Sequence, residues 1–180
     1  MESKYIKKTS IEGLVIIKPI LYEQNGFTFL ERYNYQKYKE NNLDYKFVQE
    51  NEVVSKKNVI RGMHININHP QGKLIYVLEG AILDVVIDLR KQSNTYLNYF
   101  SVVLSQESKE QLYIPEGLGH GYLALTDSKI VFKTTTHYIP NDEIGFAWNS
   151  KALKDIWPID NPILNKKDAA NKDLNMVWRI

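Results

Sequence analysis

The clearest pattern in the chain is an alternation of apolar and polar positions across residues 73–89. Lys73 and every second residue up to Gly80 share one face, and beyond Gly80 the odd-numbered residues form a second, apolar face. This period is that of a β-strand, and glycine marks a turn, so we expect two strands joined at residues 79–80. Lys73 then carries its ammonium on an otherwise apolar face, unless it lies at a sheet edge and extends to water.

The same alternation, bounded by turn signals, recurs along most of the chain and predicts about ten strands with short connections. In residues 44–51 it places Tyr45 and Phe47 on the same face as Gln49 and Asn51. Because no βαβ alternation occurs, the pattern favours an all-β antiparallel jelly-roll barrel. Helical structure is expected only within residues 31–42 and as short turns in the tail from residue 150, packed on the barrel. The other strands are expected at residues 14–19, 27–30, 59–67, 95–104, 110–114, 122–125, 130–136 and 144–148.

Composition narrows the class of protein. The chain has 180 residues and 43% hydrophobic content, which suits one domain over residues 1–180 with a core of its own. A formal net charge of +2 does not indicate nucleic-acid binding, and the absence of cysteine excludes disulfides and thiol chemistry. No apolar run approaches the roughly 18 residues of a membrane span, and the polar N-terminus lacks a signal-peptide core. We therefore expect a cytoplasmic protein that binds neither nucleic acid nor membrane.

Two motifs of the cupin family of small β-barrels have counterparts in this chain. Residues 115–120 fit Pro-x-Gly-x-x-His and end in His120. His64 and Asn66 resemble the His-x-His pair with its second histidine replaced, and Lys73 stands where the motif has a glutamate. A metal site needs about three or four protein donors. An amide and a cation in place of two ligands therefore predict a cupin pocket without a metal.

Longer motifs resemble the dTDP-4-keto-6-deoxyglucose 3,5-epimerase family of the rhamnose pathway, from about residue 13 to residue 168. The resemblance implies a homodimer of cupin barrels, with N-terminal strands contributed across the interface and no metal or organic cofactor. The motifs are Arg-Gly-Met-His at 61–64, Gln-Gly-Lys-Leu at 71–74, Asp-Val-Val-Ile-Asp-Leu-Arg at 84–90, Ile-Pro-Glu-Gly-Leu-Gly-His-Gly-Tyr at 114–122 and Ile-Trp-Pro at 156–158.

The resemblance also implies roles for individual residues. His64 resembles the catalytic base, Asp168 its carboxylate partner, and Lys73 the residue that stabilises the enolate. Tyr138 belongs to the family's Tyr-x-Pro signature. Further positions resemble substrate contacts, with Lys167 standing where the family has arginine: Gln49, Asn51, Arg61, His120, Glu143 and Lys167.

The chemistry of such a reaction explains these residue types. A ketone at carbon 4 acidifies the protons on carbons 3 and 5, and histidine is the natural base near neutral pH. A buried carboxylate fixes the tautomer of that histidine and stabilises its protonated form. A fixed cation stabilises the negative enolate oxygen and so lowers the barrier to forming the enolate. This is a reason for Lys73 to stand in an apolar pocket. Taken alone, His64 could also be a hydrogen-bonded core histidine.

Three positions depart from the family pattern. Phe132 stands where the family has its catalytic acid, a tyrosine, and a phenylalanine cannot donate a proton. Tyr138, six residues further on and part of the same motif, is the hydroxyl favoured as its replacement. Asn25 replaces the arginine of an Arg-Gly turn that holds the diphosphate across the dimer, and Leu30 replaces a glutamate, with Glu31 adjacent. The first change disfavours full double epimerisation, and the other two leave the nucleotide base open.

The leading hypothesis is an epimerase that acts on a nucleotide-diphosphate-linked 4-keto-6-deoxysugar in deoxysugar or surface-polysaccharide biosynthesis. A sugar-nucleotide 3,4-ketoisomerase and a non-catalytic sugar-nucleotide-binding cupin are the alternatives. A metal-dependent cupin oxygenase is disfavoured by Asn66 and Lys73, since neither supplies the expected ligand.

Overall fold

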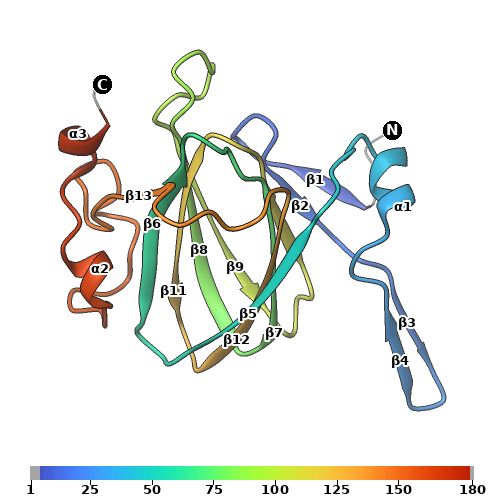
Figure 1. Cartoon of the computed structure of the whole chain (residues 1–180). Coiled ribbons are helices and arrows are strands. Elements are labelled where there is room, and N and C mark those ends of the chain that lie inside the picture. Colours follow the sequence, from blue (N-terminus) through green and yellow to red (C-terminus); the bar gives the residue numbers. More distant parts are fainter. Residues whose placement is uncertain (1–4, 179–180) are drawn as a thin grey trace.

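The computed structural model describes residues 5–178 and forms a barrel of two facing antiparallel sheets (Figure 1). The six-stranded sheet is ordered β1 (Ile6–Lys8), β2 (Val15–Ile17), β10 (Gln111–Ile114), β7 (Lys73–Glu79), β12 (Ser128–Thr134) and β5 (Gln49–Ser55). The five-stranded sheet is ordered β13 (Glu143–Gly145), β6 (Ile60–Asn66), β11 (Leu118–Ala124), β8 (Ala81–Asp88) and β9 (Tyr99–Ser105). The predicted all-β architecture is confirmed.

The inner faces of the two sheets share one apolar core. Burying one large apolar side chain in this core stabilises the fold by about 1.5–3 kcal/mol relative to leaving that side chain exposed to water. Because Ile75 and Ile130 also line the cavity described below, this core forms the floor of the cavity. Its central members are Ile75, Val77, Ile82, Val86, Leu104, Leu112 and Ile130.

The C-terminal tail covers the outer face of the five-stranded sheet. The apolar face predicted after Gly80 is this outer face, where Val85 and Ile87 pack against Leu153 and Trp157. The tail contains two short helices, α2 (Lys166–Ala169) and α3 (Leu174–Val177), as expected from the sequence. No helix within residues 5–178 is long and apolar enough to cross a membrane.

The segment before β5 covers the outer face of the six-stranded sheet, and it corrects one prediction. Tyr45 stacks on Tyr113 at 4.3 Å between ring centroids, and Phe47 packs in the same cluster. These two aromatic rings therefore lie outside the barrel, whereas Gln49 lines its interior. The alternation does not continue through residues 44–48 because the strand begins only at residue 49. Helix α1 (Tyr35–Glu40) lies within the predicted helical segment.

A polar turn shortens the strand predicted at residues 95–104, which begins at Tyr99 instead. The hydroxyls of Ser93 and Thr95 each donate to Asp88 Oδ2 at 2.7 Å, and Arg90 also donates to this carboxylate. Asp88 is fully buried, so it requires these donors. Residues 93–95 are therefore held in a loop around Asp88 rather than extended in the ladder.

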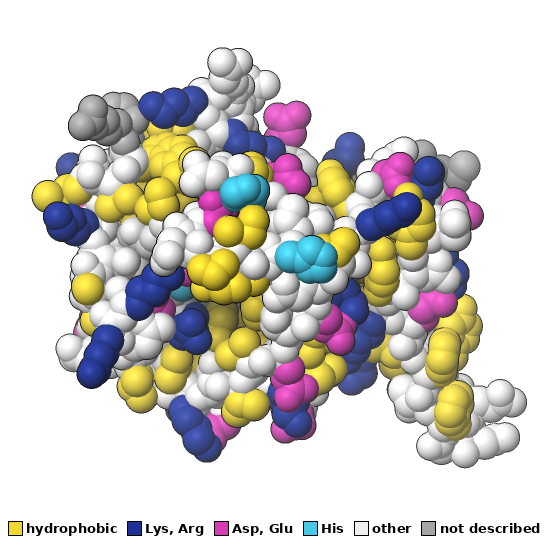
Figure 2. Space-filling view, viewed as in Figure 1, with side chains coloured by type: hydrophobic (Ala, Val, Ile, Leu, Met, Phe, Trp, Pro, Cys, Tyr) yellow, Lys and Arg dark blue, Asp and Glu magenta, His cyan; other side chains and the backbone are white. Residues whose placement is uncertain are grey.

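The N-terminal part includes a hairpin that projects from the barrel (Figure 1; Figure 2). It consists of β3 (Leu21–Gln24), a strand that the pattern did not predict, and β4 (Phe27–Leu30). Asn25 and Gly26 both have positive φ, 49° and 78°, as a two-residue hairpin turn of the primed type requires. Phe27 is 64% exposed and Phe29 48% exposed, so the hairpin presents an apolar surface.

Candidate active site

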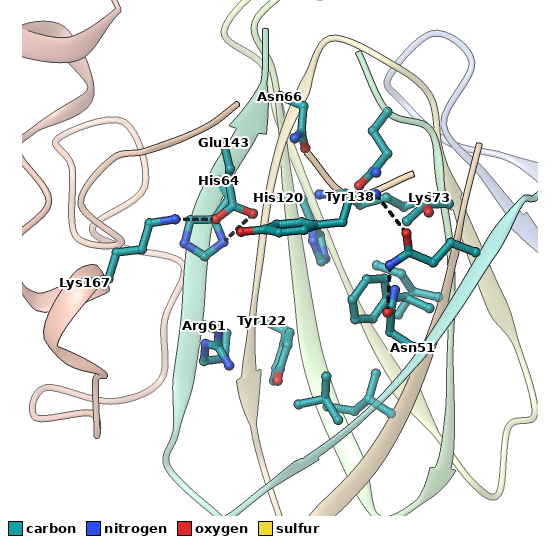
Figure 3. Close-up of a pocket in the computed structure, with 17 residues that line it drawn as sticks. Asn51, Arg61, His64, Asn66, Lys73, His120, Tyr122, Tyr138, Glu143 and Lys167 are labelled. Carbon is teal, nitrogen blue, oxygen red and sulfur yellow. Dashed lines mark hydrogen bonds and ion pairs between the residues drawn. The ribbon is translucent and has the colours of Figure 1, made fainter. Parts of the chain in front are cut away.

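One end of the barrel contains a cavity of about 500 Å³ between the two sheets (Figure 3). Its floor is apolar and its walls are polar. Of the site residues predicted from the sequence, Asp168 lies behind the wall, and all the others line the cavity: Gln49, Asn51, Arg61, His64, Lys73, His120, Phe132, Tyr138, Glu143 and Lys167.

A local irregularity in the five-stranded sheet determines the direction in which two of these side chains point. On β11, His120 pairs with His64 of β6 and Tyr122 pairs with Arg61, so the register shifts between the two pairs. In a regular strand, residues separated by three positions point to opposite faces. The shift allows both Arg61 and His64 to face the cavity.

His64 and Asp168 form a hydrogen-bonded pair, as predicted. His64 Nε2 donates to Asp168 Oδ1 at 2.6 Å, although the two residues are separated by 104 positions in the chain. The other carboxylate oxygen accepts from the Gly62 amide at 3.2 Å and from Asn165 Nδ2 at 3.0 Å. Asn165 also caps the N-terminus of α2, which orients the helix that carries Asp168.

These donors determine the charge of Asp168. Burial by itself would raise the pKa of the Asp168 carboxyl, but the bond from His64 and the donor at Gly62 outweigh it and hold the pKa below its ordinary value. Asp168 is therefore an anion that can stabilise a proton on the His64 ring. With Nε2 bound to Asp168, Nδ1 is the ring nitrogen left to take a proton from a ligand.

Glu143 contacts the other side of the same imidazole, a contact that the sequence did not predict. Its Oε2 lies 3.6 Å from His64 Nδ1, and its Oε1 accepts from Lys167 Nζ at 2.8 Å. Burial would raise the pKa of Glu143, but His64, Lys167 and Lys73 outweigh it and lower the pKa. Glu143 is therefore a carboxylate placed between the base and two cations.

Lys73 lies on the opposite wall of the cavity, on β7 of the six-stranded sheet. Burial lowers the pKa of its ammonium, and the negative charges of Glu143 and Asp84 partly oppose this shift. The alternative of an edge-strand lysine is excluded because β7 is flanked by β10 and β12. Lys73 therefore lies in the interior of the sheet and lines the cavity opposite His64.

A second histidine–carboxylate pair lies beside the first. His120 Nε2 donates to Asp84 Oδ2 at 2.9 Å, and Asp84 is completely buried. Asp84 Oδ1 has no hydrogen-bond partner. Burial raises the pKa of Asp84, and His120 and Lys73 only partly reverse this effect. The alternation identified Asp84 as opposite the apolar face of its strand, but not as a partner of His120.

The mouth of the cavity is bounded by an amide relay and an aromatic ring. Gln49 Nε2 donates to Asn51 Oδ1 at 2.9 Å, and the Tyr138 backbone N–H donates to Gln49 Oε1 at 2.8 Å. The Tyr138 ring extends across the mouth, with its hydroxyl end directed toward Glu143 and His64 (Figure 3). Phe132 lies deeper and packs against the apolar core.

The model of the dTDP-4-dehydrorhamnose 3,5-epimerase family matches residues 8–176. This chain belongs to that family. A curated relative from Methanothermobacter thermautotrophicus is 41% identical over 177 residues, covering 96% of this chain and 95% of the relative. The predicted family is thus confirmed, together with its assignment as a carbohydrate epimerase.

Solved structures of this family's fold agree with the barrel described above. The Legionella pneumophila dTDP-6-deoxy-D-glucose-3,5-epimerase in complex with dTDP-4-keto-L-rhamnose has a TM-score of 0.90 and 36% identity, covering 96% of this chain and 93% of that one. ChmJ, a 3'-monoepimerase from Streptomyces bikiniensis in complex with dTDP-quinovose, has a TM-score of 0.87 and 28% identity, covering 95% and 88%. The cupin-type fold is thereby confirmed.

Tyr122 lines the cavity of this family member but was not among the predicted site residues. Its hydroxyl lies 2.8 Å from Ser55 Oγ, and both side chains are buried. The signal was present in the sequence, since Tyr122 follows His120 by two positions and so shares its face of the strand.

Within residues 5–178, no group of three or more His, Cys, Asp and Glu side chains could hold a metal ion. His64 and His120, the two histidines in the cavity, each direct Nε2 at an aspartate. The expectation of a metal-free pocket stays a prediction.

Proposed function

We propose that this protein epimerises a nucleotide-diphosphate-linked 4-keto-6-deoxysugar next to the ketone, at carbon 3, carbon 5 or both. The observation that carries the proposal is the placement of His64, which is hydrogen-bonded to Asp168 behind it, and Lys73 on facing walls of one cavity. Base, carboxylate partner and enolate cation are the groups that proton abstraction beside a ketone requires.

The first step follows from this geometry. His64 Nδ1 removes the proton from the carbon, the electron pair moves to the ketone oxygen, and the Lys73 ammonium stabilises the enolate. Asp168 stabilises the resulting imidazolium because it is held as an anion by its other donors. We assign the diphosphate to the cationic side of the site, where Arg61 and Lys167 line the cavity.

Two further features support the wider assignment. The exposed apolar hairpin over residues 21–30 suits burial against a second copy, because an isolated two-stranded hairpin is only marginally stable in water. The working unit in this proposal is therefore a homodimer of single-domain subunits, acting in the cytoplasm in deoxysugar biosynthesis. The similar structure named as a 3'-monoepimerase is a precedent for epimerisation at one carbon only.

The test is nuclear magnetic resonance of dTDP-4-keto-6-deoxyglucose incubated with the protein in heavy water. Loss of the proton signal at carbon 3 or 5 reports exchange, and new signals of the epimer report inversion. We expect exchange to be faster than inversion, because Phe132 cannot return a proton to the opposite face. Absence of exchange at both carbons would instead favour a non-catalytic binding protein.

Phe132→Tyr sharpens the same test. A positioned general acid typically contributes about 10²–10⁴ in rate, so the added hydroxyl should raise inversion relative to exchange. Equal inversion-to-exchange ratios in the two proteins would show that the absent hydroxyl does not limit inversion.

A further inference from the structure

Inversion needs a proton donor on the wall that faces His64. That wall is formed by β5, β7 and β12 of the six-stranded sheet. Among its described cavity-lining residues, Lys73 alone carries a titratable proton. Gln49 and Asn51 are amides, and the Thr134 hydroxyl already donates to the Thr136 carbonyl at 2.8 Å.

Tyr138 is the hydroxyl that the sequence favours as a replacement acid, but it is directed elsewhere. Its ring extends across the mouth and its hydroxyl end points toward Glu143 and His64 (Figure 3). Its phenol also interacts electrostatically with Lys167, which belongs to the same side of the cavity. Tyr138 thus directs its hydroxyl to the side of the base, whereas inversion needs a donor on the opposite side.

We propose that Lys73, besides stabilising the enolate, returns the proton to the carbon on the face opposite His64. This inference rests on the proposed function. The enolate re-forms its carbonyl, the carbon takes a proton from Lys73 Nζ, and the broken N–H bond leaves a neutral amine. The cycle ends with a protonated His64 and an uncharged Lys73. Transfer of one proton from His64 to Lys73 restores both groups, so no further reagent is consumed.

The acidity of an ammonium suits this role. Lysine and tyrosine have ordinary pKa values of about 10.4 and 10, so an ammonium can replace a phenol as proton donor. In this site burial lowers the pKa of Lys73 further, which makes the ammonium a stronger acid. An ammonium bound to the ketone oxygen is also adjacent to both carbons that flank the ketone.

Glu143 provides a route for the returning proton. Its carboxylate lies 3.6 Å from His64 Nδ1, and it interacts electrostatically with both His64 and Lys73. A carboxylate between the two groups can accept a proton from the imidazolium and pass it to the amine, directly or through a water. His64 and Lys73 are then both restored within the cavity before the next turnover.

Lys73→Arg separates the two roles, because arginine keeps the positive charge but does not release a proton in proteins. In the heavy-water assay we expect both rates to fall, and the inversion-to-exchange ratio to fall by about 100-fold or more. Lys73→Gln, which fits in the volume of the lysine, is the second variant, and the same fall is expected. Titration with dTDP confirms that each variant still binds the nucleotide.

Rescue provides the control. Adding Phe132→Tyr to Lys73→Arg should restore the ratio, because the phenol then supplies the proton from the same wall. Tyr138→Phe should leave the ratio within about threefold of wild type. The inference would be overturned by an unchanged ratio in Lys73→Arg and Lys73→Gln, or by a fall in the ratio confined to Tyr138→Phe. Exchange by the wild-type protein would still support the proposed function in either case.

Discussion

The two histidine–carboxylate pairs in this pocket have the same kind of hydrogen bond and differ in their surroundings. His64 and His120 are directly paired across β6 and β11, and each donates from Nε2 to a buried aspartate, at 2.6 Å and 2.9 Å. Asp168 accepts from two further donors through its other oxygen, Oδ2. The corresponding oxygen of Asp84, Oδ1, has no partner.

This difference moves the two carboxyl pKa values in opposite directions. The pKa of Asp168 is lowered because its donors outweigh burial, and the pKa of Asp84 is raised because burial outweighs His120 and Lys73. Burial therefore does not by itself make a carboxylate a useful anion, since the number of donors decides whether the charge is stable. The His64 pair is equipped to hold a proton on its imidazole, and the His120 pair is better suited to orient a substrate contact.

The largest expected difference concerns the histidines themselves. His64→Asn should lower exchange into a 4-keto-6-deoxysugar nucleotide by about 10³ or more, because the base is lost. His120→Asn should lower it by about tenfold, through looser substrate binding. Heavy-water nuclear magnetic resonance measures both, and calorimetry with dTDP should show binding in each variant. Equal losses would mean that the two pairs share the role of base.

The carboxylates should show a smaller difference of the same kind. Asp168→Asn removes the anion that stabilises the His64 imidazolium, so kcat should fall by about 100-fold with little change in KM. Asp84→Asn should lower kcat by less than about tenfold, since an amide oxygen can still accept from His120. A larger loss in Asp84→Asn than in Asp168→Asn would reverse the assignment of the two pairs.

The smallest effect is on stability and its dependence on pH. Asp168, with a lowered pKa, stabilises the fold above its unfolded value of about 3.8, and this contribution is lost as pH falls through the folded value. Asp84, with a raised pKa, instead lowers stability as pH rises from about 3.8 through its folded value. Asp168→Asn should therefore lower the free energy of unfolding by about 1–3 kcal/mol at pH 7. Part of this loss arises because the new amide hydrogens would face the existing hydrogen-bond donors.

Asp84→Asn should change the free energy of unfolding at pH 7 by less than about 1 kcal/mol, because the new amide group can take the place of Oδ1, which accepts no hydrogen bond. Thermal unfolding between pH 3 and pH 7 measures both variants. Asp88→Asn is the matched control, since burial of Asp88 is outweighed by Arg90, Ser93 and Thr95 and its pKa falls to about 2. It should unfold at a lower temperature without changing exchange per folded molecule. Identical melting curves for Asp84→Asn and Asp168→Asn would contradict the electrostatic difference.

Much of the fold was predictable from the chain alone. The alternation across residues 73–89 located two strands and put Lys73 on an apolar face, because a strand's period determines which side chains share a face. The cupin motifs located His64 and His120, and the resemblance to the family, rather than any local pattern, supplied Asp168. The departure at Phe132 was visible without a structure.

Other features depended on tertiary packing. The alternation put Tyr45 and Phe47 on the same face as Gln49, but the two rings pack outside the barrel while Gln49 lines its interior, because the strand begins only at residue 49. Asp168 reaches His64 because the C-terminal tail packs its apolar side chains on the outer face of the five-stranded sheet. Of the donors to Asp168, Asn165 is local, whereas Gly62 and His64 lie 106 and 104 positions away in the chain. The sequence by itself thus determined the fold class and most residues of the pocket, while the tertiary structure decided which carboxylate is held as an anion, since hydrogen-bond donors and burial act only at the distances that folding creates.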